Sequence, residues 1–228
     1  MGLAAISDGI RHYCVEIANL SNMKIYAPGA GETDEQWFAN MANPHSWLML
    51  ADNLFKQAVV LNNRKGSEFI TMTDGQGRRM RWDAVDRSMF LLAGFALENA
   101  IKAFLVYENP SWVADGKLDW KLRSHRLVKL KNRSKLIPMP IRSETMLSVF
   151  EDGLESWSRY PCGLTAELTD HQRWFTPELW ASYCDLMRRY GGRLQKLLIK
   201  GWKGPHGQFG RWSFIGERFL DARQFNGP

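Results

Sequence analysis

One stretch, SMFLLAGFALENAIKAFLVYE from Ser88 to Glu108, constrains the fold of this chain more than any other. Its first ten residues are apolar or small, and the apolar character continues beyond Glu98, Asn99 and Lys102. A helix that is apolar nearly all round is normally buried. The uninterrupted run ends before Glu98, which is short of the roughly 20 residues that span a bilayer. The stretch therefore predicts the central helix of a soluble helical bundle.

Periodic apolar residues and capping signals predict the elements around that helix. Between Gly66 and Trp82, β-branched residues flank an Asp74-Gly75 turn signal, which predicts a small hairpin. The fold class is therefore all-α, a bundle of four to five main helices with a hairpin insert near residues 67–82. The other predicted helices are Ile6–Leu20, a brief helix capped by Thr33 and Gln36, Pro44–Asn63, Ser143 to about Tyr160, and Thr176–Lys200.

The chain of 228 residues divides into an N-terminal extension with a short helix (1–42), a helical domain (43–200) and a basic, aromatic tail (201–228). Its net charge of +6 and pI near 9.3 favour polyanionic partners modestly. Three cysteines without CxxC spacing and a start without signal-peptide character predict a cytoplasmic protein with no membrane partner. No spacing typical of a metal or cofactor site occurs, so neither is expected.

The polar residues in the central helix raise a question about function. Glu98 and Lys102 stand four residues apart and therefore share one helix face. One interpretation is an ion pair at the edge of the bundle. The other is a carboxylate inside the core that orients a His or Arg from another segment, because a buried charge is costly without partners. The basic segments RSHRLVKL (123–130) and WSRYP (157–161) could supply that partner.

The order of these elements resembles the HEPN superfamily, over residues 44–200. A LENAxKAxL helix follows an amphipathic helix, and a His-x-Leu-x-x-Leu loop, a helix ending in Arg-Tyr-Pro and a closing helix come next. The matching pieces are Pro44–Asn63, Phe95–Leu105, His125–Leu130, Ser143–Pro161 with Arg159–Pro161, and Thr176–Lys200. The resemblance implies a small helical bundle, usually a homodimer, of the kind found in prokaryotic toxin–antitoxin and antiviral systems.

Many HEPN proteins are metal-independent ribonucleases that use an Arg-x(4–6)-His motif. In such a motif the His exchanges protons near neutral pH while the Arg stabilises the charge on phosphorus. This chain lacks the motif, because no Arg lies five to seven positions before any of its five histidines, which are His12, His45, His125, His171 and His206. The departure favours a non-catalytic member that binds RNA or nucleotide. A ribonuclease with a displaced site and a protein-interaction module remain as alternatives.

The candidate residues follow from these hypotheses. A displaced catalytic site would use His125, Arg159 and Glu98, although a solvated loop histidine is the plain alternative for His125. The residues expected to bind RNA or nucleotide are Arg126, Arg159, Tyr160, Lys102, Arg188, Arg189 and Arg193. A cognate protein partner, such as the other half of a toxin–antitoxin pair, is the expectation of the third hypothesis.

Two further basic regions each allow two interpretations. The last helix carries Arg188, Arg189, Arg193, Lys196 and Lys200 away from its apolar stripe, as a solvated face or as a phosphate-tracking surface. The tail interleaves aromatic residues with cations, which is typical of grooves for single-stranded nucleic acid. Those aromatic residues could instead attach the tail to the bundle.

Overall fold

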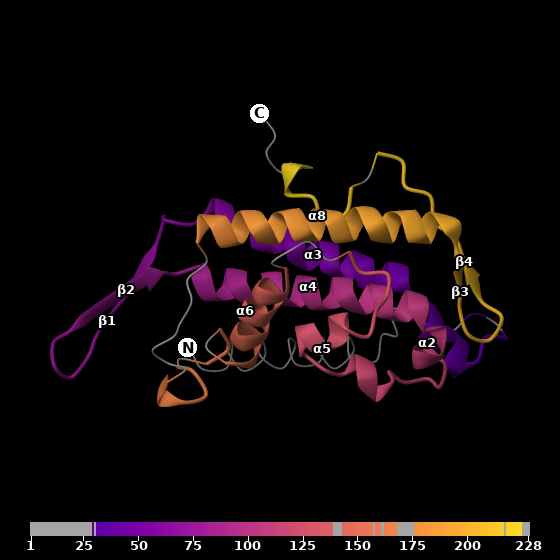
Figure 1. Cartoon of the computed structure of the whole chain (residues 1–228), viewed down its shortest axis with the longest axis horizontal. Coiled ribbons are helices and arrows are strands. Elements are labelled where there is room, and N and C mark those ends of the chain that lie inside the picture. Colours follow the sequence, from indigo (N-terminus) through magenta and orange to yellow (C-terminus); the bar gives the residue numbers. More distant parts are fainter. Residues whose placement is uncertain are drawn as a thin grey trace, which may run out of the picture.

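The computed structural model describes residues 29, 31–138, 143–156, 158–160, 162–167, 176–216 and 218–224. The helix predicted on Ile6–Leu20 lies outside these residues. Within them the chain is mainly helical, with two small two-stranded sheets. Figure 1 shows α8 lying across one side of the bundle, α4 in the middle, and α5 and α6 on the opposite side.

Local capping interactions start the first helices where the sequence predicts them. Helix α2 (Asp34–Met41) begins after Thr33, whose side chain forms a reciprocal capping box with Gln36. Helix α3 (Pro44–Asn63) begins after Asn43, whose side chain accepts a hydrogen bond from the Ser46 backbone N–H, and proline occupies its first turn. Both predictions are confirmed.

A hairpin joins α3 to α4 and confirms the predicted insert. Strands β1 (Phe69–Thr73) and β2 (Arg79–Asp83) pair antiparallel around the Asp74-Gly75 turn. The hairpin projects beyond the helices at one end of the molecule (Figure 1). Because the hairpin reverses the direction of the chain, α3 and α4 run antiparallel and pack along each other.

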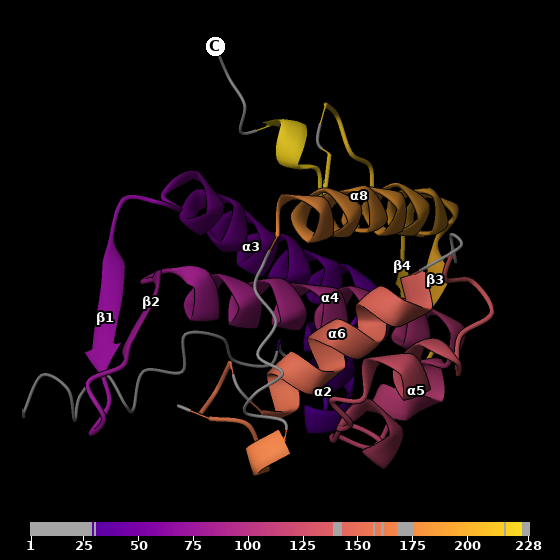
Figure 2. The same cartoon turned by 60° about the vertical axis from the view of Figure 1, so that its left-hand side comes forward.

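Helix α4 (Asp86–Glu108) is the central helix, as predicted. Sixteen of its 23 residues are buried, among them Glu98, Asn99 and Lys102. Figure 2 shows it enclosed by α3 and α8 on one side and α6 and α5 on the other. By length and apolar character α4 would also suit a membrane, but most of that stretch is buried inside the bundle, as in the core helix of a soluble protein.

Helices α5 (Leu127–Lys131) and α6 (Ser143–Glu155) cover one side of α4. The sequence predicted that α6 continues to Tyr160, and this was wrong by five residues. The hydroxyl of Ser156 donates to the Asp152 carbonyl and that of Ser158 to the Gly153 carbonyl. These side-chain bonds compete with helical backbone bonds and end the helix early.

Helix α8 (Pro177–Lys200) begins after the Thr176 cap, as predicted, and leads into the tail. The tail packs on the bundle: Trp202 is buried and its indole N–H donates to the Val106 carbonyl at 3.2 Å. Leu220 is also buried, and its backbone N–H donates to Asp52 at 2.8 Å. Gly191 permits this contact, because a Cβ there would lie 2.1 Å from the Phe219 carbonyl oxygen.

The remaining elements are short. Two 3-10 turns follow α4, and a two-stranded sheet and a final 3-10 turn lie in the tail. They are η1 (Pro110–Val113), η2 (Trp120–Leu122), β3 (Trp202–Lys203), β4 (Phe209–Gly210) and η3 (Ala222–Gln224).

Candidate functional site

A buried carboxylate organises the candidate site. Glu98 is 4% exposed, and its two oxygens bind different partners. Oε1 accepts from the Lys102 ammonium at 2.5 Å, one helical turn further along α4. Oε2 lies 2.9 Å from Nδ1 of His125. The core interpretation of the Glu98–Lys102 pair is therefore confirmed, and the predicted partner comes from the segment RSHRLVKL.

The geometry fixes how the imidazole of His125 is presented. A carboxylate only accepts hydrogen bonds, so Nδ1 donates to Glu98 and Nε2 is left to face away. The side chain of His125 is 54% exposed while that of Glu98 is 5% exposed. An interior carboxylate thus orients a histidine whose other nitrogen solvent can reach.

Neighbouring elements hold this histidine in place. Glu151 of α6 accepts a hydrogen bond from the Val128 backbone N–H at 3.0 Å, in the first turn of α5. Leu127 and Leu130 of α5 are buried in the core. His125 therefore precedes a helical turn that is fixed at both its backbone and its apolar face.

Lys102 has a second neighbour besides Glu98. Its ammonium lies 5.8 Å from the centre of the Trp47 ring, at the start of α3. A cation over an indole face is stabilised by the quadrupole of the ring. Because Lys102 is only 5% exposed, it contributes to the interior of the site and not to the surface that a polyanion would contact.

Arg159 and Tyr160 lie elsewhere. The Arg159 guanidinium stacks 5.7 Å from the ring of Tyr160, and the Tyr160 carbonyl accepts from Arg87 at 2.7 Å. Arg87 precedes Glu98 by eleven residues on α4, a rise of about 16 Å. The structure brings His125 to Glu98, but the bonds that it gives Arg159 and Tyr160 do not join them to that pair.

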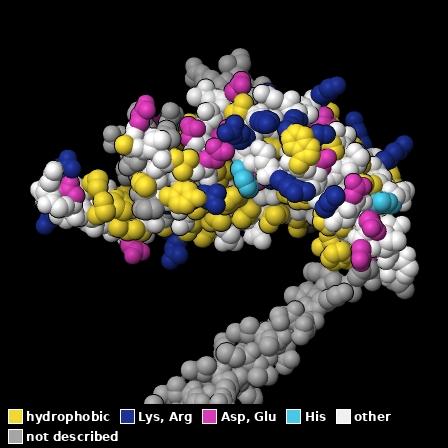
Figure 3. All heavy atoms as spheres, turned by 90° about the horizontal axis from the view of Figure 1, so that it is seen from below, with side chains coloured by type: hydrophobic (Ala, Val, Ile, Leu, Met, Phe, Trp, Pro, Cys, Tyr) yellow, Lys and Arg dark blue, Asp and Glu magenta, His cyan; other side chains and the backbone are white. Residues whose placement is uncertain are grey.

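Residues 117–135, which we call the basic segment, have a local excess of positive charge. Eight Lys and Arg face a single Asp, so this segment has a net charge of +7 in a chain whose total is +6. Arg126 is the one of the eight that forms an ion pair with a described carboxylate, Glu155 at 3.7 Å. Figure 3 shows Lys and Arg side chains gathered over this part of the molecule.

An exposed indole lies among these cations. Trp120 is 64% exposed, and the guanidinium of Arg133 lies 5.2 Å from the centre of its ring. The ammonium of Lys121 lies 5.9 Å from the same ring. Stacking platforms flanked by cations bind single-stranded nucleic acids irrespective of sequence.

The basic face of α8 differs in its pairing. Asp185 accepts from Arg189 at 2.6 Å and also from Arg188, which lies three residues away. The hydrogen bond from Arg189, and secondarily the contact with Arg188, lower the pKa of Asp185, so the carboxylate stays charged. Arg193 instead lies close enough to Tyr107 to oppose the pKa increase that burial causes there.

Sequence reasoning gave Trp120 and Trp47 no role in a site, and it did not propose residues 117–135 as one binding surface. The net charge of residues 117–135 was readable from the sequence, whereas the contact between Lys102 and Trp47 depends on how α3 packs against α4. Of the two interpretations of the tail, attachment to the bundle is the one that applies to Trp202, Trp212 and Phe214. These side chains are buried or packed against the core. Among the described residues no cluster of His, Cys, Asp and Glu could hold a metal ion.

Comparisons with known proteins add no relative. No family model, curated protein or solved structure matches the chain.

Proposed function

We propose that this protein binds single-stranded RNA through the basic segment. The observation that carries the proposal is Trp120, an exposed indole with Arg133 and Lys121 near its ring, in a segment of net charge +7. Cations attract the phosphate backbone, and an aromatic face stacks on a base. In the described structure this segment combines both, and of its eight cations only Arg126 forms an ion pair with a described carboxylate.

The proposal extends to the biological setting that the HEPN resemblance implies. The order of elements between residues 44 and 200 supports a HEPN-like bundle, acting as a homodimer in a prokaryotic stress or defence system. Binding without catalysis agrees with the missing Arg-x(4–6)-His motif. Arg126 of the predicted binding residues lies in the basic segment, whereas Arg188 and Arg189 are held by Asp185.

Gel electrophoresis of end-labelled single-stranded RNA tests this function. Purified protein is incubated with the RNA in EDTA and run on paired native and denaturing gels. A shift on the native gel with intact RNA on the denaturing gel is the expected result. RNA that is neither shifted nor cut would overturn the proposal and direct attention to a cognate protein partner.

A second candidate function, metal-independent RNA cleavage, is favoured by the contact between Glu98 and His125. Nε2 of His125 would accept the proton of a 2′-hydroxyl while the 2′-oxygen attacks phosphorus. The 5′-oxygen would leave with a proton from water, and the products would be a 2′,3′-cyclic phosphate and a 5′-hydroxyl. Glu98 would hold the imidazole in the tautomer that can accept this proton.

The denaturing gel distinguishes the two functions. Cleavage in EDTA that leaves cyclic phosphate ends, and that disappears in His125→Gln, would establish the second function. The matched control is His206→Gln, which makes the same substitution at an exposed histidine of the tail that contacts the Ala114 carbonyl and not Glu98. Cleavage that persists in His125→Gln would rule out this histidine as the base.

A further inference from the structure

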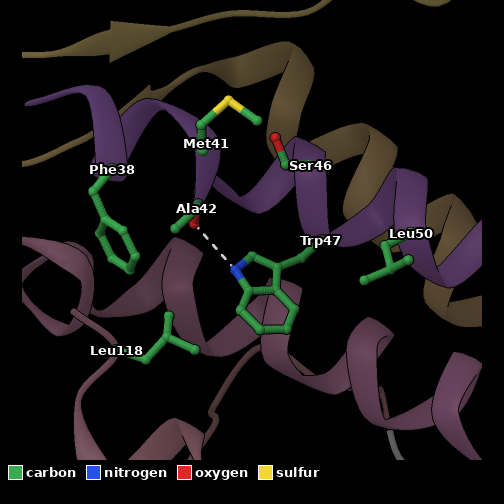
Figure 4. A pocket seen from close by; sticks show the side chains of 7 residues that line it. All are labelled: Phe38, Met41, Ala42, Ser46, Trp47, Leu50 and Leu118. Carbon is green, nitrogen blue, oxygen red and sulfur yellow. Dashed lines mark hydrogen bonds between the residues drawn. The ribbon is translucent and has the colours of Figure 1, made fainter. Parts of the chain in front are cut away.

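A hollow in the surface adjoins the basic segment at Leu118. It has a volume of about 280 Å³ and lies between the end of α2, the start of α3 and the loop before η2. Figure 4 shows the rings of Phe38 and Trp47 on opposite sides of it, with Leu118 below. The lining residues are Phe38, Met41, Ala42, Ser46, Trp47, Leu50 and Leu118.

The hollow is apolar and offers few hydrogen-bonding groups. The indole N–H of Trp47 already donates to the Ala42 carbonyl at 3.1 Å, as Figure 4 shows. Ser46 supplies the one hydroxyl among the lining side chains. A ligand would therefore be held by stacking and apolar contact. The volume is at the small end for ligand pockets and suits one flat ring system better than a whole cofactor.

Positive charge adjoins one wall of the hollow. Leu118 belongs to the basic segment, and its carbonyl accepts two bonds from the Arg123 guanidinium, at 3.1 Å from Nε and 3.0 Å from Nη2. Arg123 and the neighbouring Lys117 are exposed. Glu35 of α2 packs against Gly116, next to Lys117, and is a carboxylate near this wall. A ligand with a phosphate attached would place that phosphate on the Arg123 side, away from Glu35.

We infer that the hollow binds one unpaired base of the RNA, stacked between Phe38 and Trp47, with the adjoining phosphates on Arg123 and Lys117. This inference rests on the proposed RNA binding and names a second contact for the same strand. The buried ammonium of Lys102, 5.8 Å from the Trp47 ring, lies on the interior side of that indole. Since hydrogen-bonding groups are scarce, the pocket accepts any base and favours purines for their larger stacking area.

The test compares oligoadenylate with an abasic oligomer of the same length, using fluorescence anisotropy in EDTA. Wild-type protein should bind the oligoadenylate more tightly, and Phe38→Leu should weaken that binding about 5-fold or more, as loss of one stacked base does. Binding of the abasic oligomer should be unchanged in Phe38→Leu. Leucine keeps the site apolar, and circular dichroism checks that the variant is folded.

Leu50→Ala is a second test of the hollow, and Met49→Ala is its matched control. Both are 47% exposed on α3, but Leu50 lines the hollow and Met49 does not. Leu50→Ala should weaken oligoadenylate binding and Met49→Ala should not. If Phe38→Leu leaves oligoadenylate binding unchanged, the base pocket is wrong while RNA binding through the basic segment stands. If wild-type protein binds neither oligomer, both the pocket and the proposed function are wrong.

Discussion

The basic segment and the basic face of α8 carry the same kinds of side chain but differ in what surrounds them. On α8, Asp185 binds both Arg188 and Arg189, so one carboxylate already occupies two adjacent arginines and offsets one of their two charges. In the basic segment, one of eight cations has an ion pair with a described carboxylate, and two others lie 5.2 and 5.9 Å from the ring centre of an exposed indole. The difference teaches that local pairing, and not the count of cations, decides which surface attracts a polyanion.

The same spacing also occurs in the interior. Glu98 and Lys102 stand four residues apart, as Asp185 and Arg189 do, but their side chains are 5% and 7% exposed where the α8 pair is about half exposed. A surface pair is screened by water, whereas a buried pair leaves an uncompensated charge when one member is lost. The polar residues in the central helix are therefore tolerated because each has a partner.

The largest expected effect is on stability. Glu98→Ala should lower the free energy of unfolding by about 3–5 kcal/mol, because Lys102 would remain buried without its counter-charge. Denaturant unfolding followed by circular dichroism measures this change. The surface comparison is Asp185→Ala, for which about 1 kcal/mol or less is expected. Equal effects of the two substitutions would contradict the distinction between them.

The next largest effect separates the two basic surfaces. Replacing Lys117, Arg126 and Lys129 together by Gln should weaken RNA binding by about 100-fold and reduce the salt slope by about 2, because three phosphate contacts are lost. The matched variant replaces Arg188, Arg189 and Arg193 by Gln and should change affinity by less than about 3-fold. Anisotropy titrations at several salt concentrations measure both, and a reversed order would refute the assignment.

Loss of the exposed indole should have an intermediate effect. Trp120→Ala should weaken RNA binding by about 1–2 kcal/mol through lost stacking. It should leave stability almost unchanged, since the side chain is 64% exposed. Phe209→Ala provides the control, because Phe209 is equally exposed but lies in the tail. An equal loss of affinity in both variants would mean that Trp120 is not a stacking platform.

The smallest expected effect is a gain of RNA affinity when the arginines of α8 are released from their carboxylate partner. Asp185→Asn removes the negative charge that pairs with Arg188 and Arg189 while keeping a side chain of similar shape. RNA affinity should rise by a few-fold at low salt, and the gain should vanish at high salt, where exposed charges are screened. Unchanged affinity at every salt concentration would show that α8 cannot contact RNA even when its arginines are released.

Much of the fold could be predicted because its signals are local. Thr33, Asn43 and Thr176 each cap a helix at the position where the structure starts one, and Asp74-Gly75 turns the hairpin. The early end of α6 was missed because the bonds of Ser156 and Ser158 to backbone carbonyls compete with a pattern that still reads as helical.

The candidate site could be predicted in part. The pairing of Glu98 with Lys102 follows from helical spacing. The energetic cost of a buried charge suggested a His or Arg partner from RSHRLVKL or WSRYP, and the structure supplies His125. The hollow could not be predicted, because Phe38, Trp47 and Leu118 meet only through the packing of three separate segments. The pairing of Arg188 and Arg189 with Asp185 could have been predicted from the sequence, since Asp185 precedes them by three and four residues.

Photo-crosslinking tests the central claim most directly, because it reports where RNA lies on the protein. Single-stranded RNA is crosslinked to the full chain by ultraviolet light, and the modified peptides are identified by mass spectrometry. RNA binding through the basic segment predicts crosslinks within residues 117–135, above all at Trp120. Crosslinks confined to α8, around Arg188 and Arg189, would contradict it.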